Sequence, residues 1–129
     1  MKATPMVWAG RVLTALFALF MLGASITPKF FFRPVAETNL EGLGWPDGYV
    51  LMIGVMELTF LLLYLFPRTS TLGAVLMTGL LGGAMATQVR AESPLFTHIL
   101  FSIYLGLFMW GGLWLRDERL RALFPWRKA

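Results

Sequence analysis

The residue with the clearest chemical potential in this sequence is Glu57, a single carboxylate at the centre of the apolar stretch Tyr49–Phe66. A charged side chain at the middle of a bilayer costs several kcal/mol unless it is neutral, paired or hydrated. Some other part of the chain must therefore supply a partner, or the carboxylate must handle a proton or a ligand. Ionisable residues inside membrane segments are, by default, candidates for a functional site.

Three further polar residues are expected at a similar depth, namely Gln88, Arg90 and His98. Gln88 and Arg90 end one apolar stretch, and His98 lies near the start of the next. At a rise of about 1.5 Å per residue, Glu57 lies about 12 Å and His98 about 4.5 Å inside the same end of the helices. We predict that these four side chains converge in the outer half of one bundle as a ligand or proton site.

Each of these residues also has a simpler role. Arg90 suits a solvated anchor, His98 a local hydrogen bond, and Gln88 a packing contact at a helix end. Glu57 suits a buried lock between helices, but even that role requires a specific partner.

Possible partners of Glu57 are Lys29, Arg11 and Tyr64. Arg11 lies one turn inside the first apolar block, where its long side chain can return to the headgroups. Tyr64 lies seven residues after Glu57 and so shares its helical face.

The composition places the chain in a membrane. Of its 129 residues, 57% are hydrophobic and 14% charged, whereas about a quarter are charged in soluble domains. The absence of cysteine excludes disulfides, thiolate metal sites and iron–sulfur clusters, and the single histidine does not build a zinc or bis-histidine haem site. We therefore expect no metal centre. The net charge of +4 comes from basic residues beside apolar blocks, which indicates anionic lipid rather than nucleic acid as their partner.

Four apolar blocks are each long enough to cross a hydrocarbon core of about 30 Å as a helix. We predict an all-α, integral membrane four-helix up-and-down bundle, forming one transmembrane domain over residues 1–129. The first block carries Arg11 and is long for a signal peptide, so we expect it to remain uncleaved. The predicted spans are residues 8–26, 49–66, 71–89 and 95–115, followed by a basic tail over 116–129.

The longest connection runs from Thr27 to Gly48 and is expected outside the cytoplasm. Pro28 and Pro34, together with several glycines, exclude one continuous helix through it. A short helix is predicted inside it over Val35–Leu43. In the tail, four spaced apolar residues predict a second short helix that lies on the membrane surface, Leu120, Leu123, Phe124 and Trp126.

Gly79 and Gly83 form a pair of small residues four apart in the third block, continued by Thr87. In lipid, such rows let two helix backbones approach closely. We expect them to pack within this chain, and a face between two copies is the alternative.

Counting Lys and Arg predicts the orientation. With four spans, one side holds seven basic residues, Lys2, Arg68, Arg116, Arg119, Arg121, Arg127 and Lys128. The other side holds three, Lys29, Arg33 and Arg90. The excess of positive charge predicts that both termini are cytoplasmic.

Seven short features are spread along nearly the whole chain: Lys29, Leu43-Gly44-Trp45-Pro46, Gly54-Val55-Met56-Glu57, Pro67-Arg68-Thr69, Leu72-Gly73-Ala74, Gly82-Gly83-Ala84 and Leu115-Arg116-Asp117. In these features the chain resembles the DoxX-like family of small bacterial membrane proteins. The resemblance implies four transmembrane helices in the bacterial inner membrane. Where many relatives carry a histidine this chain has Gln88, which cannot relay a proton as histidine does.

Related branches of that family include a small subunit of thiosulfate:quinone oxidoreductase and proteins tied to oxidative stress. The resemblance therefore suggests an accessory subunit of a membrane oxidoreductase system that contacts quinone. The alternatives are a small-molecule binding or proton-linked transport protein that uses Glu57, and a purely structural membrane scaffold. The lipid bilayer is the expected partner, with a partner oxidoreductase subunit or a second copy of the chain in addition. Whether the chain is itself an enzyme stays open.

Overall fold

A computed structural model describes residues 4–46 and 48–126, and in this part of the chain all regular elements are helices. Three of the basic residues in the charge count, Lys2, Arg127 and Lys128, lie outside the described residues. The elements in chain order are α1 (Pro5–Phe20), the π-helix η1 (Met21–Ile26), α2 (Thr27–Phe31), α3 (Arg33–Gly42), α4 (Val50–Leu65), α5 (Ser70–Arg90), the π-helix η2 (Leu95–Ile99), α6 (Phe101–Arg116) and α7 (Glu118–Leu123).

The first helix is longer than the sequence predicts, because α1, η1 and α2 form one helix of 27 residues. The prediction that the connection begins at Thr27 is therefore wrong. Pro28 lies in the first turn of α2, directly after a π-helical turn in which the Thr27 N–H donates to the carbonyl of Leu22, five residues back. Proline is tolerated where its missing N–H falls at a change of helical register. Lys29 consequently lies in the helix and not in a loop.

Three helices are long and apolar enough to cross a membrane: Pro5–Phe31, Ser70–Arg90 and Leu95–Arg116. They correspond to three of the four predicted spans, and they support a membrane protein. The remaining apolar helix, α4, has 16 residues. At about 1.5 Å per residue it is about 24 Å long, slightly below the usual length of a span. The fourth crossing stays a prediction.

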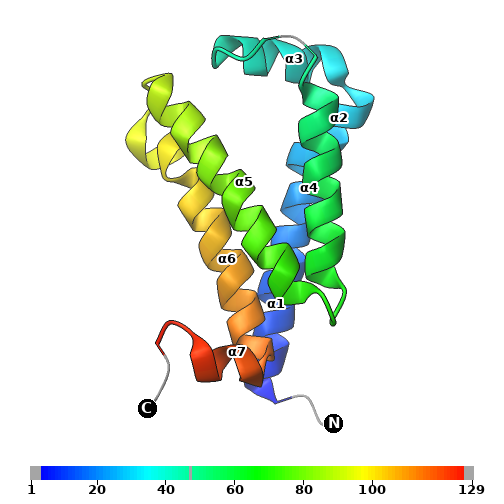
Figure 1. The fold of residues 1–129 in the computed structure, drawn as a ribbon, viewed down its shortest axis with the longest axis vertical. Helices are drawn as coiled ribbons and strands as arrows, with labels where there is room; N and C mark the ends of the chain where they lie inside the picture. The colour runs from blue at the N-terminus through cyan, green and yellow to red at the C-terminus, as the bar shows by residue number, and fades with distance from the viewer. Residues whose placement is uncertain (1–3, 47, 127–129) are drawn as a thin grey trace.

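The long helices associate in pairs, with α1 against α6 and α4 against α5, while α5 also contacts α6. Figure 1 shows that α1 begins, and α7 lies, at one end of the molecule, whereas α3 crosses the opposite end. We call these the α7 end and the α3 end. The helices meet closely toward the α7 end and diverge toward the α3 end (Figure 1).

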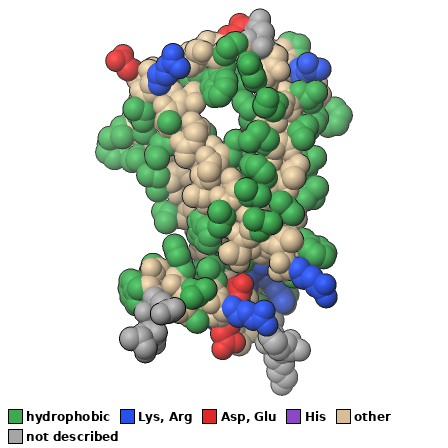
Figure 2. Space-filling model, viewed as in Figure 1, with side chains coloured by type: hydrophobic (Ala, Val, Ile, Leu, Met, Phe, Trp, Pro, Cys, Tyr) green, Lys and Arg blue, Asp and Glu red, His purple; other side chains and the backbone are tan. Residues whose placement is uncertain are grey.

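The best-packed core lies toward the α7 end, where Phe17, Tyr64 and Met109 are at most 1% exposed. Figure 2 shows hydrophobic side chains over the flanks of the helices and charged side chains gathered at the two ends. Large apolar residues of this surface, such as Leu19 and Leu107, are about two-thirds exposed, at 67% and 65%. A soluble protein rarely presents so continuous an apolar surface, so this one fits contact with lipid.

The close packing predicted within the chain at Gly79 and Gly83 is not found. A Cβ added at either residue would meet no described atom of another helix within 4 Å. The buried residues of α5 are Ser70, Gly73, Ala74, Met77 and Leu81. Gly79 and Gly83 each come two residues after a member of that row, about 200° around the helix, and so lie on the opposite face.

The helices approach closely at three other glycines. A Cβ at Gly73 on α5 would meet the backbone of Tyr64 on α4, and a Cβ at Gly10 on α1 would lie 2.7 Å from the carbonyl of Gly112 on α6. A Cβ at Gly112 would in turn lie 2.7 Å from the hydroxyl of Thr14. Small residues do allow backbone contact here, as expected in lipid, but at positions other than the predicted pair.

The two predicted surface helices both form. The first, α3, begins near Pro34, as predicted for Val35–Leu43. The tail helix α7 buries Leu120, which is 8% exposed, and leaves Leu123 exposed, but it ends at Leu123, so the predicted members Phe124 and Trp126 lie outside it. Its position on a membrane surface stays a prediction.

Candidate functional site

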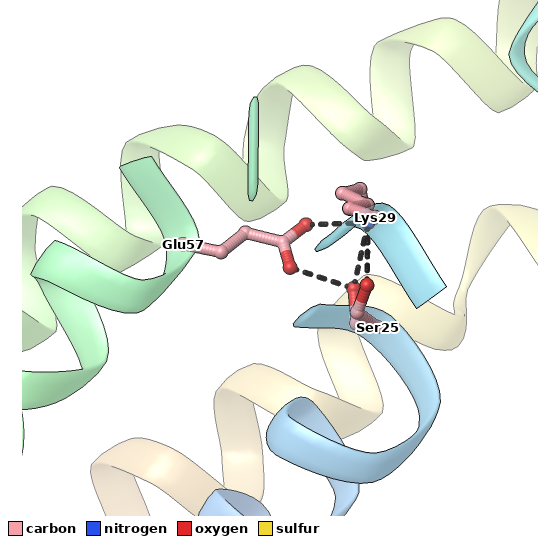
Figure 3. Close-up of polar contacts among 3 residues, drawn as sticks. All are labelled: Ser25, Lys29 and Glu57. Carbon is pink, nitrogen blue, oxygen red and sulfur yellow. Dashed lines mark hydrogen bonds and ion pairs between the residues drawn. The ribbon is translucent and has the colours of Figure 1, made fainter. Parts of the chain in front are cut away.

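Glu57 is buried, at 6% exposed, and its partners come from the first helix. Its Oε1 lies 3.0 Å from Lys29 Nζ, and its Oε2 accepts a hydrogen bond of 2.8 Å from Ser25 Oγ. Figure 3 shows the three side chains converging between α4 and the first helix. The partner that a buried carboxylate requires is therefore Lys29, supported by Ser25.

The π-helical turn and a glycine position these partners. Ser25 belongs to η1 and Lys29 to α2, and their spacing of four residues places both on one face of the helix. Gly54 lies one turn before Glu57, and a Cβ there would be only 3.1 Å from the Cβ of Lys29. The absence of a side chain at Gly54 therefore lets the Lys29 side chain lie against α4.

The three side chains form a closed set of hydrogen bonds. Besides its ion pair, Lys29 Nζ donates to the carbonyl of Ser25 at 3.1 Å and to its hydroxyl at 3.0 Å. Breaking a buried ion pair of this kind strands the remaining charge, which is strongly destabilising. The set joins α4 to the first helix.

A cavity of about 240 Å³ lies beside Glu57, between the first helix and the α5–α6 pair. Most of its lining is apolar, and its polar lining residues are Ser25, Glu57, Gln88, His98 and Ser102. Figure 2 shows the surface hollowed between α4 and α5 toward the α3 end.

The structure thus brings Glu57, Gln88 and His98 around one cavity, and it separates them from Arg90. Arg90 lines a second hollow of about 180 Å³ together with Thr87 and the segment Leu43–Pro46. Gln88 and Arg90 are two residues apart on α5, so they point to different sides of the helix. The role of the cavity as a site stays a prediction.

Two of the possible partners of Glu57 lie elsewhere. The Arg11 guanidinium lies over the ring of Trp8, 4.9 Å from its centroid. The Tyr64 hydroxyl donates to the carbonyl of Met109 and lies 3.3 Å from the Thr14 hydroxyl, in the core toward the α7 end.

Two features of the cavity wall are typical of functional sites. Both π-helical segments of the described chain contribute to it, η1 through Ser25 and η2 through His98. Such segments are rare and occur frequently at functional sites. In addition, Gln88 Oε1 is buried without a hydrogen-bond partner among the described residues, and unpaired buried polar groups are uncommon in native structures.

Ser25 and Ser102 were missed by the sequence analysis. Ser25 could have been found from its position four residues before Lys29, had that segment been predicted as helical. For Ser102 no signal in the sequence distinguishes it from other small polar residues of membrane helices. The His98 ring bonds locally, with Nδ1 2.8 Å from the Thr97 hydroxyl.

Comparison with known proteins agrees with the resemblance noted in the sequence. No curated protein and no solved structure matches this chain. The pattern of the DoxX-like family, in contrast, matches residues 12–112, which include α4, α5 and both walls of the cavity. Since this match covers more than three-quarters of the 129 residues, the chain belongs to the DoxX-like family.

Proposed function

We propose that this protein is an accessory subunit of an oxidoreductase system in the bacterial inner membrane, in which it holds a quinone-like molecule. The observation that carries the proposal is the cavity beside Glu57, which combines apolar walls with a few polar groups. Sites for small molecules commonly have this composition. Because the flanks of the helices and most of the cavity lining are apolar, its ligand would come from the bilayer.

The size of the cavity suits one ring. A cavity of about 150 Å³ holds benzene, and drug-sized ligands occupy about 300–1,000 Å³. The volume of about 240 Å³ lies between these values. We therefore expect the ring of the ligand inside the cavity and its hydrocarbon tail among the lipids.

The accessory role follows from the residues that the chain lacks. With no cysteine and a single histidine, the sequence offers few ligands for a redox centre of its own. The electrons of a bound quinone would be exchanged with a partner subunit, and this chain would supply binding and orientation.

Mass spectrometry of the gently extracted protein tests the proposal, because it reads bound lipophilic molecules and stoichiometry together. The parent should carry a quinone-like molecule. Ala84→Phe, which places a ring in the cavity wall, should lose it. The matched control Val75→Phe changes an exposed residue of the same helix and should retain it. A parent protein that carries no such molecule would contradict the proposal.

A second candidate is proton-linked transport or small-molecule binding that depends on Glu57, favoured by the contact of this buried carboxylate with the cavity. It predicts that Glu57→Gln, although destabilised, abolishes ligand flux into vesicles even at temperatures at which thermal unfolding shows the variant to be folded, with a companion loss in His98→Ala. In a purely structural scaffold, the ion pair with Lys29 would only join helices, and filling the cavity would change no activity.

The proposed location includes both termini in the cytoplasm and four crossings. Single cysteines at Asn39 on α3 and Arg119 on α7 test this, because the chain has no cysteine of its own. With four crossings, Asn39→Cys should react with an impermeant reagent from outside and Arg119→Cys only from the cytoplasm. If α4 does not cross, both positions should label from the same side.

A further inference from the structure

We infer that the cavity recognises the reduced, dihydroxy form of a ring ligand in preference to its oxidised, dicarbonyl form, with Glu57 accepting the hydrogen of one hydroxyl. This inference rests on the proposed function and deepens it by naming the chemical form that is bound. We call Glu57 and Ser25, which line the cavity, together with Lys29, which binds both, the Glu57 wall. The inference follows from a count of the hydrogen-bond donors and acceptors that remain unused in this wall.

The donors of this wall are all used. A lysine ammonium has three N–H groups, and Lys29 Nζ has three acceptors, namely Glu57 Oε1 at 3.0 Å and the Ser25 carbonyl and hydroxyl oxygens at 3.1 and 3.0 Å. The single O–H of Ser25 points to Glu57 Oε2 at 2.8 Å. Neither residue can therefore donate a hydrogen bond to a ligand without giving up one that it already forms.

Acceptor capacity, in contrast, remains. An ionised carboxylate offers about four lone-pair sites, and the partners of Glu57 are one donor on each oxygen. Glu57 also lines the cavity. A ligand group that reaches this wall must therefore donate a hydrogen. A hydroxyl does so. A quinone carbonyl offers only lone pairs, so it would form no hydrogen bond with the carboxylate, and the two oxygens would repel each other.

The opposite wall does not distinguish the two forms. Its polar residues are Gln88, His98 and Ser102, contributed by α5, η2 and α6 among apolar lining residues. Amide, imidazole and hydroxyl groups can each donate or accept. A carbonyl or a hydroxyl at the far edge of the ring would find a partner there. The preference for one redox form must then come from the Glu57 wall.

The test compares three matched probes on the full chain in lipid nanodiscs under anaerobic conditions: a short-chain alkyl hydroquinone, the corresponding quinone, and the dimethyl ether of the hydroquinone. Titration calorimetry gives a Kd for each. We expect the hydroquinone to bind at least about tenfold more tightly than the other two, because a hydrogen bond to a charged group changes an affinity by roughly that factor.

The outcomes separate this inference from the function on which it rests. Equal or tighter binding of the quinone or the ether would overturn the inference and leave a quinone-holding function standing. Failure of all three probes to bind would overturn both.

A pair of variants tests whether Glu57 is the acceptor. The double variant Lys29→Gln with Glu57→Gln removes both charges and places amides, which donate as well as accept, on this wall. We expect the preference for hydroquinone to fall below about threefold, with folding checked by thermal unfolding. Arg11→Gln, which removes a charge at Trp8 away from the cavity, should keep the full preference. A double variant that folds and keeps a tenfold preference would show that Glu57 is not the acceptor.

Discussion

At the α7 end of this molecule helix backbones touch, with Gly10 against Gly112 and, farther along, Gly73 against Tyr64. At the α3 end the helices leave a cavity, and beside it the ion pair of Glu57 with Lys29 joins α4 to the first helix. The α7 end is held by many short contacts among small and fully buried residues. The α3 end is held by a few strong polar contacts. Beside these contacts, polar groups that line the cavity remain available to a ligand.

This difference shows how a small membrane protein can be both stable and open. Apolar side chains gain little from meeting each other in lipid, so close packing and hydrogen bonds must hold the helices together. Concentrating the close packing at one end allows the other end to keep a cavity. Regions with sparse contacts are also where ligand-binding elements are usually found.

The largest expected effect comes from breaking the ion pair that holds the open end. Lys29→Met should lower the free energy of unfolding by about 3–5 kcal/mol, because it strands the buried carboxylate of Glu57. Unfolding in detergent micelles measures this loss. Adding Glu57→Met to the same chain should restore most of the stability, since apolar replacements of a buried pair are often neutral. A single variant as stable as the parent would show that the pair holds nothing together.

A somewhat smaller effect is expected where the helices touch. Gly73→Ala should destabilise the protein by about 1–3 kcal/mol, because its Cβ would meet the backbone of Tyr64. Backbone atoms, unlike the end of a side chain, have no other rotamer in which to avoid the contact. Gly83→Ala is the matched control on the same helix, since a Cβ there meets no described atom of another helix within 4 Å. Equal melting of the two variants would refute close packing at Gly73.

Removing one hydroxyl from the core should matter less. Tyr64→Phe removes the hydrogen bond to the Met109 carbonyl and the contact with the Thr14 hydroxyl. We expect a loss of about 1 kcal/mol in unfolding free energy, the usual net value of such a bond. Ligand binding should be unchanged, because Tyr64 is not among the residues that line the cavity. A variant that binds less ligand while keeping its stability would place Tyr64 in the site.

The smallest effect on stability is expected inside the cavity. Ser102 forms no hydrogen bond with another described side chain, so Ser102→Ala should change the unfolding free energy by less than about 0.5 kcal/mol. Binding of a hydroquinone should nevertheless weaken by about three- to tenfold, because the far wall loses one polar group. Calorimetry on both variant and parent measures this. Unchanged affinity would remove Ser102 from the site.

The sequence was sufficient to predict that Glu57 needs a partner, because an unpaired carboxylate among apolar residues is costly anywhere in a membrane. It also placed Gln88 and His98 at a common level, since the rise per residue of a helix hardly varies. It could not place Lys29 correctly, because a proline after an apolar block normally marks the end of a helix. The π-helical turn that accommodates Pro28 leaves no trace in the hydrophobic pattern.

The sequence also could not show which of the small residues pack against a neighbouring helix. Gly73, Gly79 and Gly83 are equally able to admit a neighbouring helix, and only the position of α4 decides which face of α5 is used. Arg90 illustrates the same point at the site. It shares the depth of Gln88, but a separation of two residues turns it away from the cavity.

The π-helical turn Met21–Ile26 also decides where this chain can vary in length. A π-helical turn holds about one residue more than an α-helical turn needs. Deleting Ala24 would therefore restore a regular α-helix and leave the residues after it on nearly the same faces, so that Lys29 would still meet Glu57. Deleting a residue from the regular helix before this turn, such as Leu16 of α1, would instead rotate everything after it by about 100° and turn Lys29 away from Glu57. A change in length outside the π-helical turn would then act on the site as strongly as a substitution of its side chains.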